Sequence, residues 1–197
     1  SELSDPASMI GPSLAMVTGD AGRGKTEAAL RFATQSEAIY IPAPIKPRTP
    51  SMMLREIAFE LVGTRPLRGE ECQIVIGDAL QRDRRLIMID EADRASMEVL
   101  EMLRGMNERF ASPILLIGED VLRRRIGSRK RLQSRIRLFL EFGPVTQQDV
   151  AFFFKQSLVV APPAVTALIH KYAEGDWRPV LTVAIGIERA MKATGTQ

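Results

Sequence analysis

The chain has 197 residues, 45% of them hydrophobic, which is enough for one large domain or for a domain with a small attachment. It contains one cysteine and one histidine, so an internal disulfide and a zinc site built from Cys and His ligands are both excluded. No uninterrupted apolar run is long enough to span a bilayer, and the first residues lack the order of a signal peptide, so we expect a cytoplasmic protein.

The net charge of +3 is unevenly distributed along the chain. Between Arg123 and Arg137 there are eight basic residues and no acidic one. Once these eight charges are removed from the total, the remainder of the chain has a net charge of −5. A local cationic stretch on an otherwise acidic chain favours an anionic partner, most often DNA or RNA.

Short apolar runs alternate with helical periodicity over the first three quarters of the chain. Strands are expected at 14–17, 38–41, 86–89, 113–118 and 138–142. Helices are expected at 25–35, 51–62, 70–82 and 96–110, followed by two short helices within 119–137 that are broken at Gly127-Ser128. Ser51 is the expected N-cap of the second helix, and Gly63 is expected to end it. This alternation is typical of a three-layer α/β fold with a five-stranded parallel sheet.

The pattern changes at Gly143-Pro144, which marks the expected domain boundary. Beyond it there is no strand signal, only helical segments at 146–158, 163–174 and 178–192. We therefore expect an α/β nucleotide-binding core over 1–143 and a small helical domain over 144–197.

A glycine-rich loop follows the first expected strand and leads directly into the first helix. It reads Gly19, Asp20, Ala21, Gly22, Arg23, Gly24, Lys25 and Thr26, and these residues together with Glu27, which follows in the helix, are the expected nucleotide-binding residues. The spacing G-x4-G-K-T between a strand and a helix predicts a P-loop, in which backbone N–H groups and the helix N-terminus surround phosphate. Lys25 would reach the β- and γ-phosphates of ATP, and the Thr26 hydroxyl would coordinate Mg²⁺.

Two acidic residues, Asp90 and Glu91, follow the buried strand expected at 86–89. In parallel sheets, ligands bind at the carboxyl ends of the strands, which is where these side chains stand. Asp90 would hold Mg²⁺ directly or through water, and Glu91 would polarise the water that attacks the γ-phosphate. Together with the P-loop, this pair predicts an ATPase site.

The sequence resembles the AAA+ ATPases, and within them the DNA-transposition ATPases of the phage Mu B type. The similar segments are GKTEAA at 24–29, IDEAD at 89–93, EVLE at 98–101 and SRI at 134–136, and the resemblance covers roughly residues 10–190. It implies a core with a helical lid, oligomerisation with ATP into a ring or helical filament on double-stranded DNA, and a transposase as partner. It also implies ATP hydrolysis that is stimulated by oligomerisation and by DNA.

The resemblance also assigns roles to individual residues outside the P-loop. Arg135 matches the arginine finger that reaches the ATP of a neighbouring subunit, with Arg129 and Arg131 as competitors for that role. Arg178, in the sequence GDWR at 175–178, matches the lid arginine that contacts the γ-phosphate. At the end of the fourth strand the family places a small polar sensor residue, whereas this chain has Glu119, whose carboxylate a γ-phosphate would repel.

Basic residues outside the nucleotide motifs are candidates for contacts with duplex DNA phosphates. The candidates are Lys46, Arg48, Arg123, Arg124, Arg129, Lys130 and Arg131, and also Arg55, Arg65 and Arg68. No aromatic residue interrupts the basic run before Phe139, so we expect salt-sensitive binding to the duplex backbone and no base stacking. The alternative is an arginine-rich face that serves only a subunit interface.

Two other functions remain open at this point. The same fold could serve as a replication-initiator or helicase-loader ATPase, whose main partner would be a helicase. A small-molecule P-loop kinase is the third possibility, although Glu91 and the basic run suit water activation and polymer binding better than transfer to a metabolite.

Overall fold

The computed structural model describes residues 14–42, 48–157 and 161–194. The chain divides into two compact units. The first, here called the α/β unit, comprises Ser1–Gly19 and Lys25–Glu141. The second, the helical unit, comprises Asp20–Gly24 and Phe142–Gln197, so it includes five residues of the glycine-rich loop.

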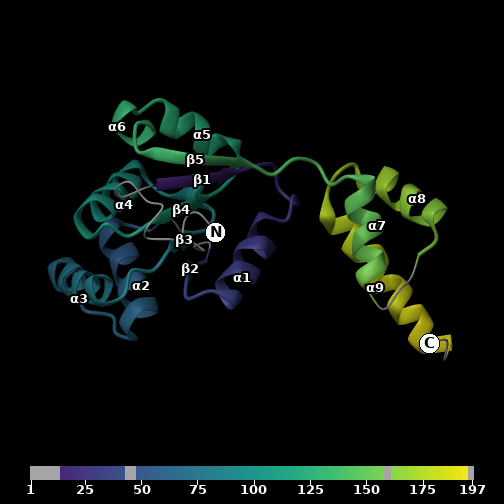
Figure 1. The fold of residues 1–197 in the computed structure, drawn as a ribbon, viewed down its shortest axis with the longest axis horizontal. Coiled ribbons are helices and arrows are strands. Elements are labelled where there is room, and N and C mark those ends of the chain that lie inside the picture. The colour runs from purple at the N-terminus through teal and green to yellow at the C-terminus, as the bar shows by residue number, and fades with distance from the viewer. Residues whose placement is uncertain (1–13, 43–47, 158–160, 195–197) are drawn as a thin grey trace. The chain divides into compact units, whose positions relative to one another are not determined.

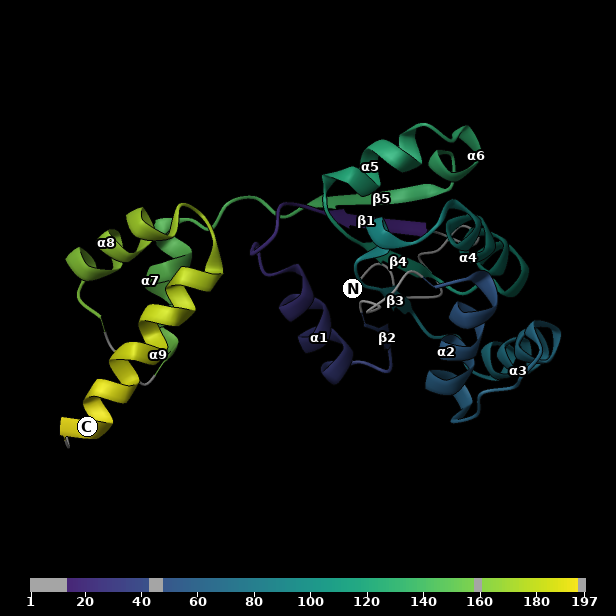
Figure 2. The ribbon, with the colours of Figure 1, turned by 180° about the vertical axis from the view of Figure 1, so that it is seen from behind.

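A five-stranded parallel sheet forms the centre of the α/β unit (Figures 1 and 2). Its strands are β1 Leu14–Thr18, β2 Ile39–Ile41, β3 Ile87–Ile89, β4 Ile114–Ile117 and β5 Ile136–Glu141, in the spatial order β2-β3-β4-β1-β5. The expected α/β fold with a five-stranded parallel sheet is confirmed. Strand β5 begins two residues earlier than expected, because Ile136 pairs with Leu14 of β1.

The helices of the α/β unit lie at or near their expected positions. They are α1 Lys25–Gln35, α2 Pro50–Val62, α3 Gly69–Arg82, α4 Met97–Phe110, α5 Asp120–Gly127 and α6 Lys130–Gln133, with a short 3₁₀ helix, η1, at Ala92–Arg94. The expected Ser51 N-cap of α2 is wrong, because the Thr49 hydroxyl accepts from the N–H of Met52 instead. Pro50 then occupies the first helical turn, where its missing N–H costs nothing. Gly63 ends α2 in the left-handed conformation, as expected.

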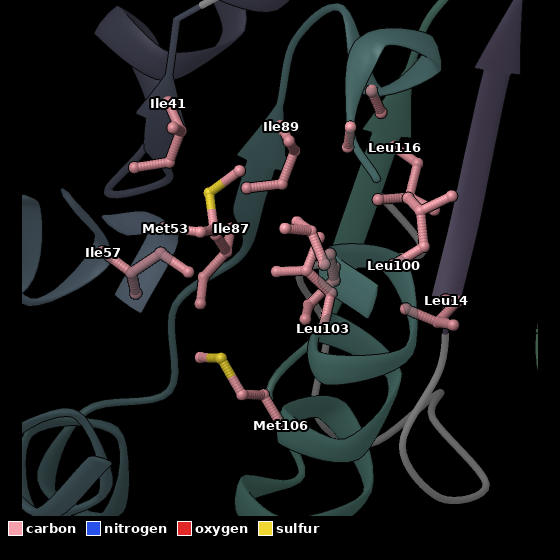
Figure 3. Close-up of a cluster of buried hydrophobic side chains, with 14 of the residues drawn as sticks. Leu14, Ile41, Met53, Ile57, Ile87, Ile89, Leu100, Leu103, Met106 and Leu116 are labelled. Carbon is pink, nitrogen blue, oxygen red and sulfur yellow. The ribbon is translucent and has the colours of Figure 1, made fainter. Parts of the chain in front are cut away.

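The core of the α/β unit lies between the sheet and helices α2 and α4 (Figure 3). Alternate strand residues such as Ile87 and Ile89 point into it, together with Ile57 of α2 and Leu103 of α4, all at most 2% exposed. Burying a side chain of this size contributes about 1.5–3 kcal/mol. This packing fixes the strand ends that carry the candidate site.

The helical unit consists of α7 Gln147–Gln156, α8 Pro163–Ala173 and α9 Trp177–Thr194. Helix α7 starts with a capping box, in which Thr146 and Asp149 exchange hydrogen bonds between side chain and backbone. The three helices share a small core that includes Val150, Phe154 and Val180. Among the described residues, no helix is long and apolar enough to cross a membrane.

Candidate nucleotide site

The magnesium half of the predicted site lies within the α/β unit. Thr26 stands in the first turn of α1, and Asp90 follows β3 directly. The Thr26 hydroxyl donates to Asp90 Oδ2 at 2.8 Å, so the two predicted metal-binding residues lie side by side. Lys25 Nζ donates to the Gly19 carbonyl at 2.8 Å and thereby closes the base of the glycine-rich loop. A hydroxyl and a carboxylate at this distance are oxygen ligands that suit Mg²⁺.

Asp90 is only 4% exposed, and its carboxylate is fixed by three donors. Besides Thr26, the Tyr40 hydroxyl donates to Oδ2 at 2.6 Å, and the backbone N–H of Glu91 donates to Oδ1 at 2.8 Å. Burial, the hydrogen bond to Asp90 and the nearby carboxylates raise the pKa of Tyr40 above its ordinary range. The phenol therefore stays protonated and acts as the donor.

The residues around Tyr40 predict a strand and indicate no role for it at the site. Its contact with Asp90 depends on the pairing of β2 with β3, which no local motif reveals. The only signal in the sequence is its position in the middle of the apolar strand Ile39–Ile41, where a polar hydroxyl needs a partner.

Glu91, the predicted base, has a left-handed backbone with φ 48° and ψ 40°. For a residue other than glycine this conformation costs roughly 1–2 kcal/mol, and such strain is often found at functional sites. The Glu91 carboxylate pairs with Arg94 of η1 at 2.5 Å. This ion pair was not anticipated, because a three-residue 3₁₀ helix has no recognisable sequence pattern. Arg94 and Glu91 are both partly exposed, so the pair can open.

The loop between β3 and α4 is held against the end of β4. Asp93 Oδ1 accepts from the N–H of Glu119 at 3.1 Å, and a Cβ on Gly118 would lie 2.5 Å from the same oxygen. Arg125 of α5 donates to the carbonyls of Asp93 and Ala95. Glu119 contributes its backbone N–H to this arrangement, and its own side chain is exposed. At the position where the family places a sensor side chain, Glu119 therefore contributes its backbone N–H and not its carboxylate.

Within the helical unit, the glycine-rich loop packs against the turn that precedes α9. Gly22 has φ 75°, and its carbonyl accepts from the N–H of Trp177 at 2.9 Å. A Cβ on Gly22 would overlap the Asp176 carboxylate, so only glycine fits there. Arg23 donates to the Gly175 carbonyl and pairs with Asp20 at 3.1 Å. The loop glycines predicted to curve around phosphate thus also allow this close approach.

Arg178, the predicted lid arginine, lies in the first turn of α9 and is exposed. Its guanidinium is 3.9 Å from Asp176, and its backbone N–H donates to Asp176 Oδ1 at 2.7 Å. The Arg178 side chain is 69% exposed, which leaves it accessible to a ligand. Its predicted contact with phosphate remains a prediction.

Arg135, the predicted finger, stands between α6 and β5. Its Nε lies 2.6 Å from Glu108 Oε1 of α4, and Arg104 pairs with the other oxygen of Glu108 at the same distance. The two guanidinium groups, Arg135 first, hold the pKa of the Glu108 carboxyl below its usual value. No motif around Glu108 predicts this contact, because the residue lies 27 positions from Arg135.

The basic stretch forms an exposed surface of α5, α6 and the start of β5. Arg123 lies over the Phe139 ring at 4.3 Å and is 3.6 Å from Glu141. In the part of the chain that the structure describes, the following exposed residues form no ion pair: Arg124, Arg129, Lys130, Arg131 and Arg137.

The other DNA candidates have more varied surroundings. Arg48 donates to the Pro42 carbonyl at 3.3 Å. Arg65 pairs with Glu56 and lies over the Phe59 ring at 4.1 Å, whereas Arg68 is exposed at the start of α3. Arg55 is half-buried, and Lys46 lies outside the described residues.

Comparisons with known proteins identify relatives of this chain. A segment of 130 residues, which covers 64% of this chain, is 32% identical to the ATP-dependent target DNA activator B of Escherichia phage Mu. A Mu-like prophage DNA transposition protein B of Haemophilus influenzae is 34% identical over 109 residues, or 54% of this chain. These matches span 41% and 38% of the respective relatives, so the chain matches about two fifths of their length.

Solved structures and a family model supply the remaining comparisons. The ORC2 protein of Aeropyrum pernix superposes with a TM-score of 0.72 at 19% identity, over 99% of this chain and 61% of that one. At this identity the similarity establishes the fold alone. The model of the AAA domain matches residues 10–126, which include the glycine-rich loop, Asp90 and Glu91. The chain is a member of the AAA domain family and is distantly related to transposition protein B of phage Mu.

Proposed function

We propose that this protein is an ATP-dependent, DNA-binding ATPase that regulates DNA transposition by binding target DNA and activating a transposase. The observation that carries the nucleotide part of the proposal is the 2.8 Å hydrogen bond between Thr26 and Asp90. It joins the last residue of the glycine-rich loop to the acidic residue after β3. The relation to the target DNA activator of phage Mu supports the DNA part.

The glycine-rich loop would bind the phosphates of ATP through its backbone N–H groups and the N-terminus of α1. Lys25 now donates to Gly19 and would turn to the β- and γ-phosphates. Thr26 and Asp90 would hold Mg²⁺, which neutralises phosphate charge when it is bound. Among the described residues, no group of three or more His, Cys, Asp or Glu side chains is placed to hold a metal ion. Mg²⁺ in nucleotide sites commonly has only one or two protein carboxylates, so two oxygen ligands suffice.

Hydrolysis requires a base and a positive charge at the γ-phosphate. Glu91 would polarise the attacking water once its carboxylate is released from Arg94. Arg178 would approach the γ-phosphate from the helical unit, and Arg135 would supply the finger to a neighbouring subunit. Arg135 would have to exchange Glu108 for the phosphate of that neighbour, which makes hydrolysis depend on oligomerisation.

The exposed basic surface of α5 and α6 supports binding to duplex DNA through phosphates. Arg124, Arg129, Lys130 and Arg131 form no ion pair with an acidic side chain among the described residues, which leaves their charges to attract phosphate. ATP would join subunits into a ring or filament that aligns these surfaces along DNA. A DNA partner of this kind would place the protein in the cytoplasm.

Fluorescence anisotropy with labelled duplex DNA tests this proposal. The protein is titrated at two salt concentrations with a non-hydrolysable ATP analogue or with ADP, and Lys25→Ala is the nucleotide-binding control. We expect tight, salt-sensitive binding by the wild-type protein with the ATP analogue only, because counterion release weakens phosphate contacts as salt rises. Lys25→Ala should bind DNA equally weakly with the ATP analogue and with ADP.

Two results would contradict the proposal in different ways. Binding of duplex DNA that is identical with ADP, with the ATP analogue and in Lys25→Ala would show that nucleotide does not control it. Wild-type protein that binds the nucleotide but ignores DNA in every state would assign the basic surface to a subunit interface. In that case, capture of a replicative helicase instead of a transposase would identify the helicase-loader function.

A further inference from the structure

The pairing of two neighbouring strands brings Tyr40 to Asp90. In β2, Ile39 and Ile41 point into the core, so Tyr40 points to the opposite face of the sheet. Tyr40 is paired in register with Met88 of β3, and Asp90 lies two residues further along on the same face. A diagonal neighbour at this spacing is within reach of a long aromatic side chain. A backbone hydrogen bond continues this pairing beyond the strand ends, since the N–H of Asp90 donates to the Ile41 carbonyl at 3.0 Å.

The hydroxyl of Tyr40 and that of Thr26 share one oxygen of Asp90. Each carboxylate oxygen has about two lone-pair sites. The donors at 2.6 Å and 2.8 Å therefore fill both sites of Oδ2. Within the described part of the chain, Oδ1 accepts only the N–H of Glu91, at 2.8 Å, which leaves it one lone-pair site. The arrangement fixes the plane of the carboxylate and selects the oxygen that remains for a cation or its water.

We propose that Tyr40 is a positioning residue that orients the Asp90 carboxylate for Mg²⁺-dependent nucleotide binding. Tyr40 would act only through Asp90. The inference rests on the proposed nucleotide site and adds to it a residue that no P-loop motif contains. Without the Tyr40 hydroxyl, Oδ2 regains a free lone pair, and two donors in place of three hold the carboxylate. Its plane would then be less firmly fixed when the cation binds.

Tyr40→Phe tests this role, because it removes a single oxygen atom and keeps the ring. The readout is the Mg²⁺ concentration that half-saturates binding of a fluorescent, non-hydrolysable ATP analogue, titrated with MgCl₂ from an EDTA-treated sample. Residues that orient metal ligands typically change metal affinity by 10–100-fold when mutated. We expect Tyr40→Phe to require about tenfold more Mg²⁺, with affinity for the Mg²⁺-free analogue unchanged.

The chain offers a matched control in its other tyrosine. Tyr172 of α8 is 70% exposed and lies in the helical unit, so Tyr172→Phe removes the same atom far from Asp90 in the sequence. Its Mg²⁺ dependence should equal that of the wild-type protein. A purely structural role of Tyr40 would lower the melting temperature and leave the Mg²⁺ dependence unchanged.

Each outcome separates this inference from the proposed function. If the wild-type protein binds the analogue with Mg²⁺ and Tyr40→Phe has the same or a lower Mg²⁺ requirement, the positioning role is overturned and the nucleotide site stands. If the wild-type protein binds no nucleotide, both are overturned. A shift of about tenfold in Tyr40→Phe, absent in Tyr172→Phe, supports both.

Discussion

Arg135 is held by Glu108, with Nε and Oε1 2.6 Å apart. The other oxygen of the same carboxylate binds Arg104, so two guanidinium groups share one acid on the surface of α4. An arginine that must reach a neighbouring subunit has to leave such a partner. Because the second arginine stays behind, Glu108 is not left without a positive neighbour when Arg135 moves.

The pKa of Glu108 provides a direct test of this pair. Arg135 is the largest cause that lowers this pKa, and Arg104 is the next. In Arg135→Ala, a carbon-13 NMR titration should therefore show the Glu108 pKa rising toward the ordinary glutamate value while Arg104 still holds it below. Glu188, whose pKa is lowered by Lys192 on α9, should be unchanged. An unchanged Glu108 pKa would show that the two side chains do not pair in solution.

The same pair affects how stability depends on pH. A carboxyl group whose folded-state pKa is lowered stabilises the protein above its unfolded pKa, about 4.3 for glutamate. This contribution is lost as the pH falls through the folded value. The free energy of unfolding of Arg135→Ala should therefore approach that of the wild-type protein as the pH falls below about 4.

A mixing experiment tests whether Arg135 acts on a neighbour. Arg135→Ala should bind ATP normally and lose hydrolysis, and Glu91→Gln should bind ATP and accumulate in the ATP-bound assembly. In a mixture, an Arg135→Ala subunit keeps its own Glu91 and can receive Arg135 from a Glu91→Gln neighbour. We expect the phosphate-release rate of the mixture to exceed that of either variant alone. A mixture as inactive as its components would contradict an intersubunit role.

Arg129→Ala and Arg131→Ala identify the finger among its competitors. Both residues are exposed and lie close to Arg135 in the sequence. We expect each of these variants to keep ATP hydrolysis at high protein concentration, where subunits assemble. If either loses hydrolysis while Arg135→Ala retains it, the finger assignment moves to that residue.

The number of DNA phosphates that α6 contacts can be measured from the salt dependence of DNA binding. Lys130→Ala combined with Arg131→Ala removes two exposed charges with no acidic partner among the described residues. The slope of log K against log salt should fall by about 0.9 for each phosphate that the variant no longer neutralises. The double variant Arg109→Ala, Lys171→Ala removes the same charge elsewhere and should keep the wild-type slope. Equal slopes in both double variants would remove α6 from the DNA-binding surface.

The sequence predicted the parts of the site that are contiguous motifs. Gly19–Thr26 and the Asp90-Glu91 pair are recognisable because local spacing and flanking strands specify their conformation. The strand order β2-β3-β4-β1-β5 was not predicted, and the contact of Tyr40 with Asp90 follows from it. Glu108 was missed for the same reason, since its partner Arg135 is distant in sequence.

Capping chemistry also limited the prediction. Ser51 was a reasonable N-cap by residue type, but Pro50 favours the first turn of a helix and moved the cap to Thr49. The helix η1 was missed because three residues carry no periodicity. Sequence therefore located the motif residues of the candidate site better than it located the contacts that hold them in place.

The stability of the helical unit can be measured separately through its tryptophan. Trp177 is the only tryptophan of the chain and packs against Phe153, with ring centroids 5.7 Å apart, so its fluorescence reports on this unit. Phe154 is 1% exposed in the core of α7, α8 and α9, whereas Phe152 is 63% exposed on the same helix. Phe154→Ala should lower the free energy of unfolding by about 3–5 kcal/mol, because apolar surface is no longer buried and a cavity is left behind.

Phe152→Ala is the matched control for this measurement and should change the free energy by no more than about 0.5 kcal/mol. Urea unfolding followed at the tryptophan emission gives both values, and the slope against urea shows whether each variant unfolds as one unit. Similar losses of stability in the two variants would mean that Phe152 is covered in solution. In that case the exposed face of α7 would be an interface, and the dependence of the Phe152 effect on protein concentration would reveal it.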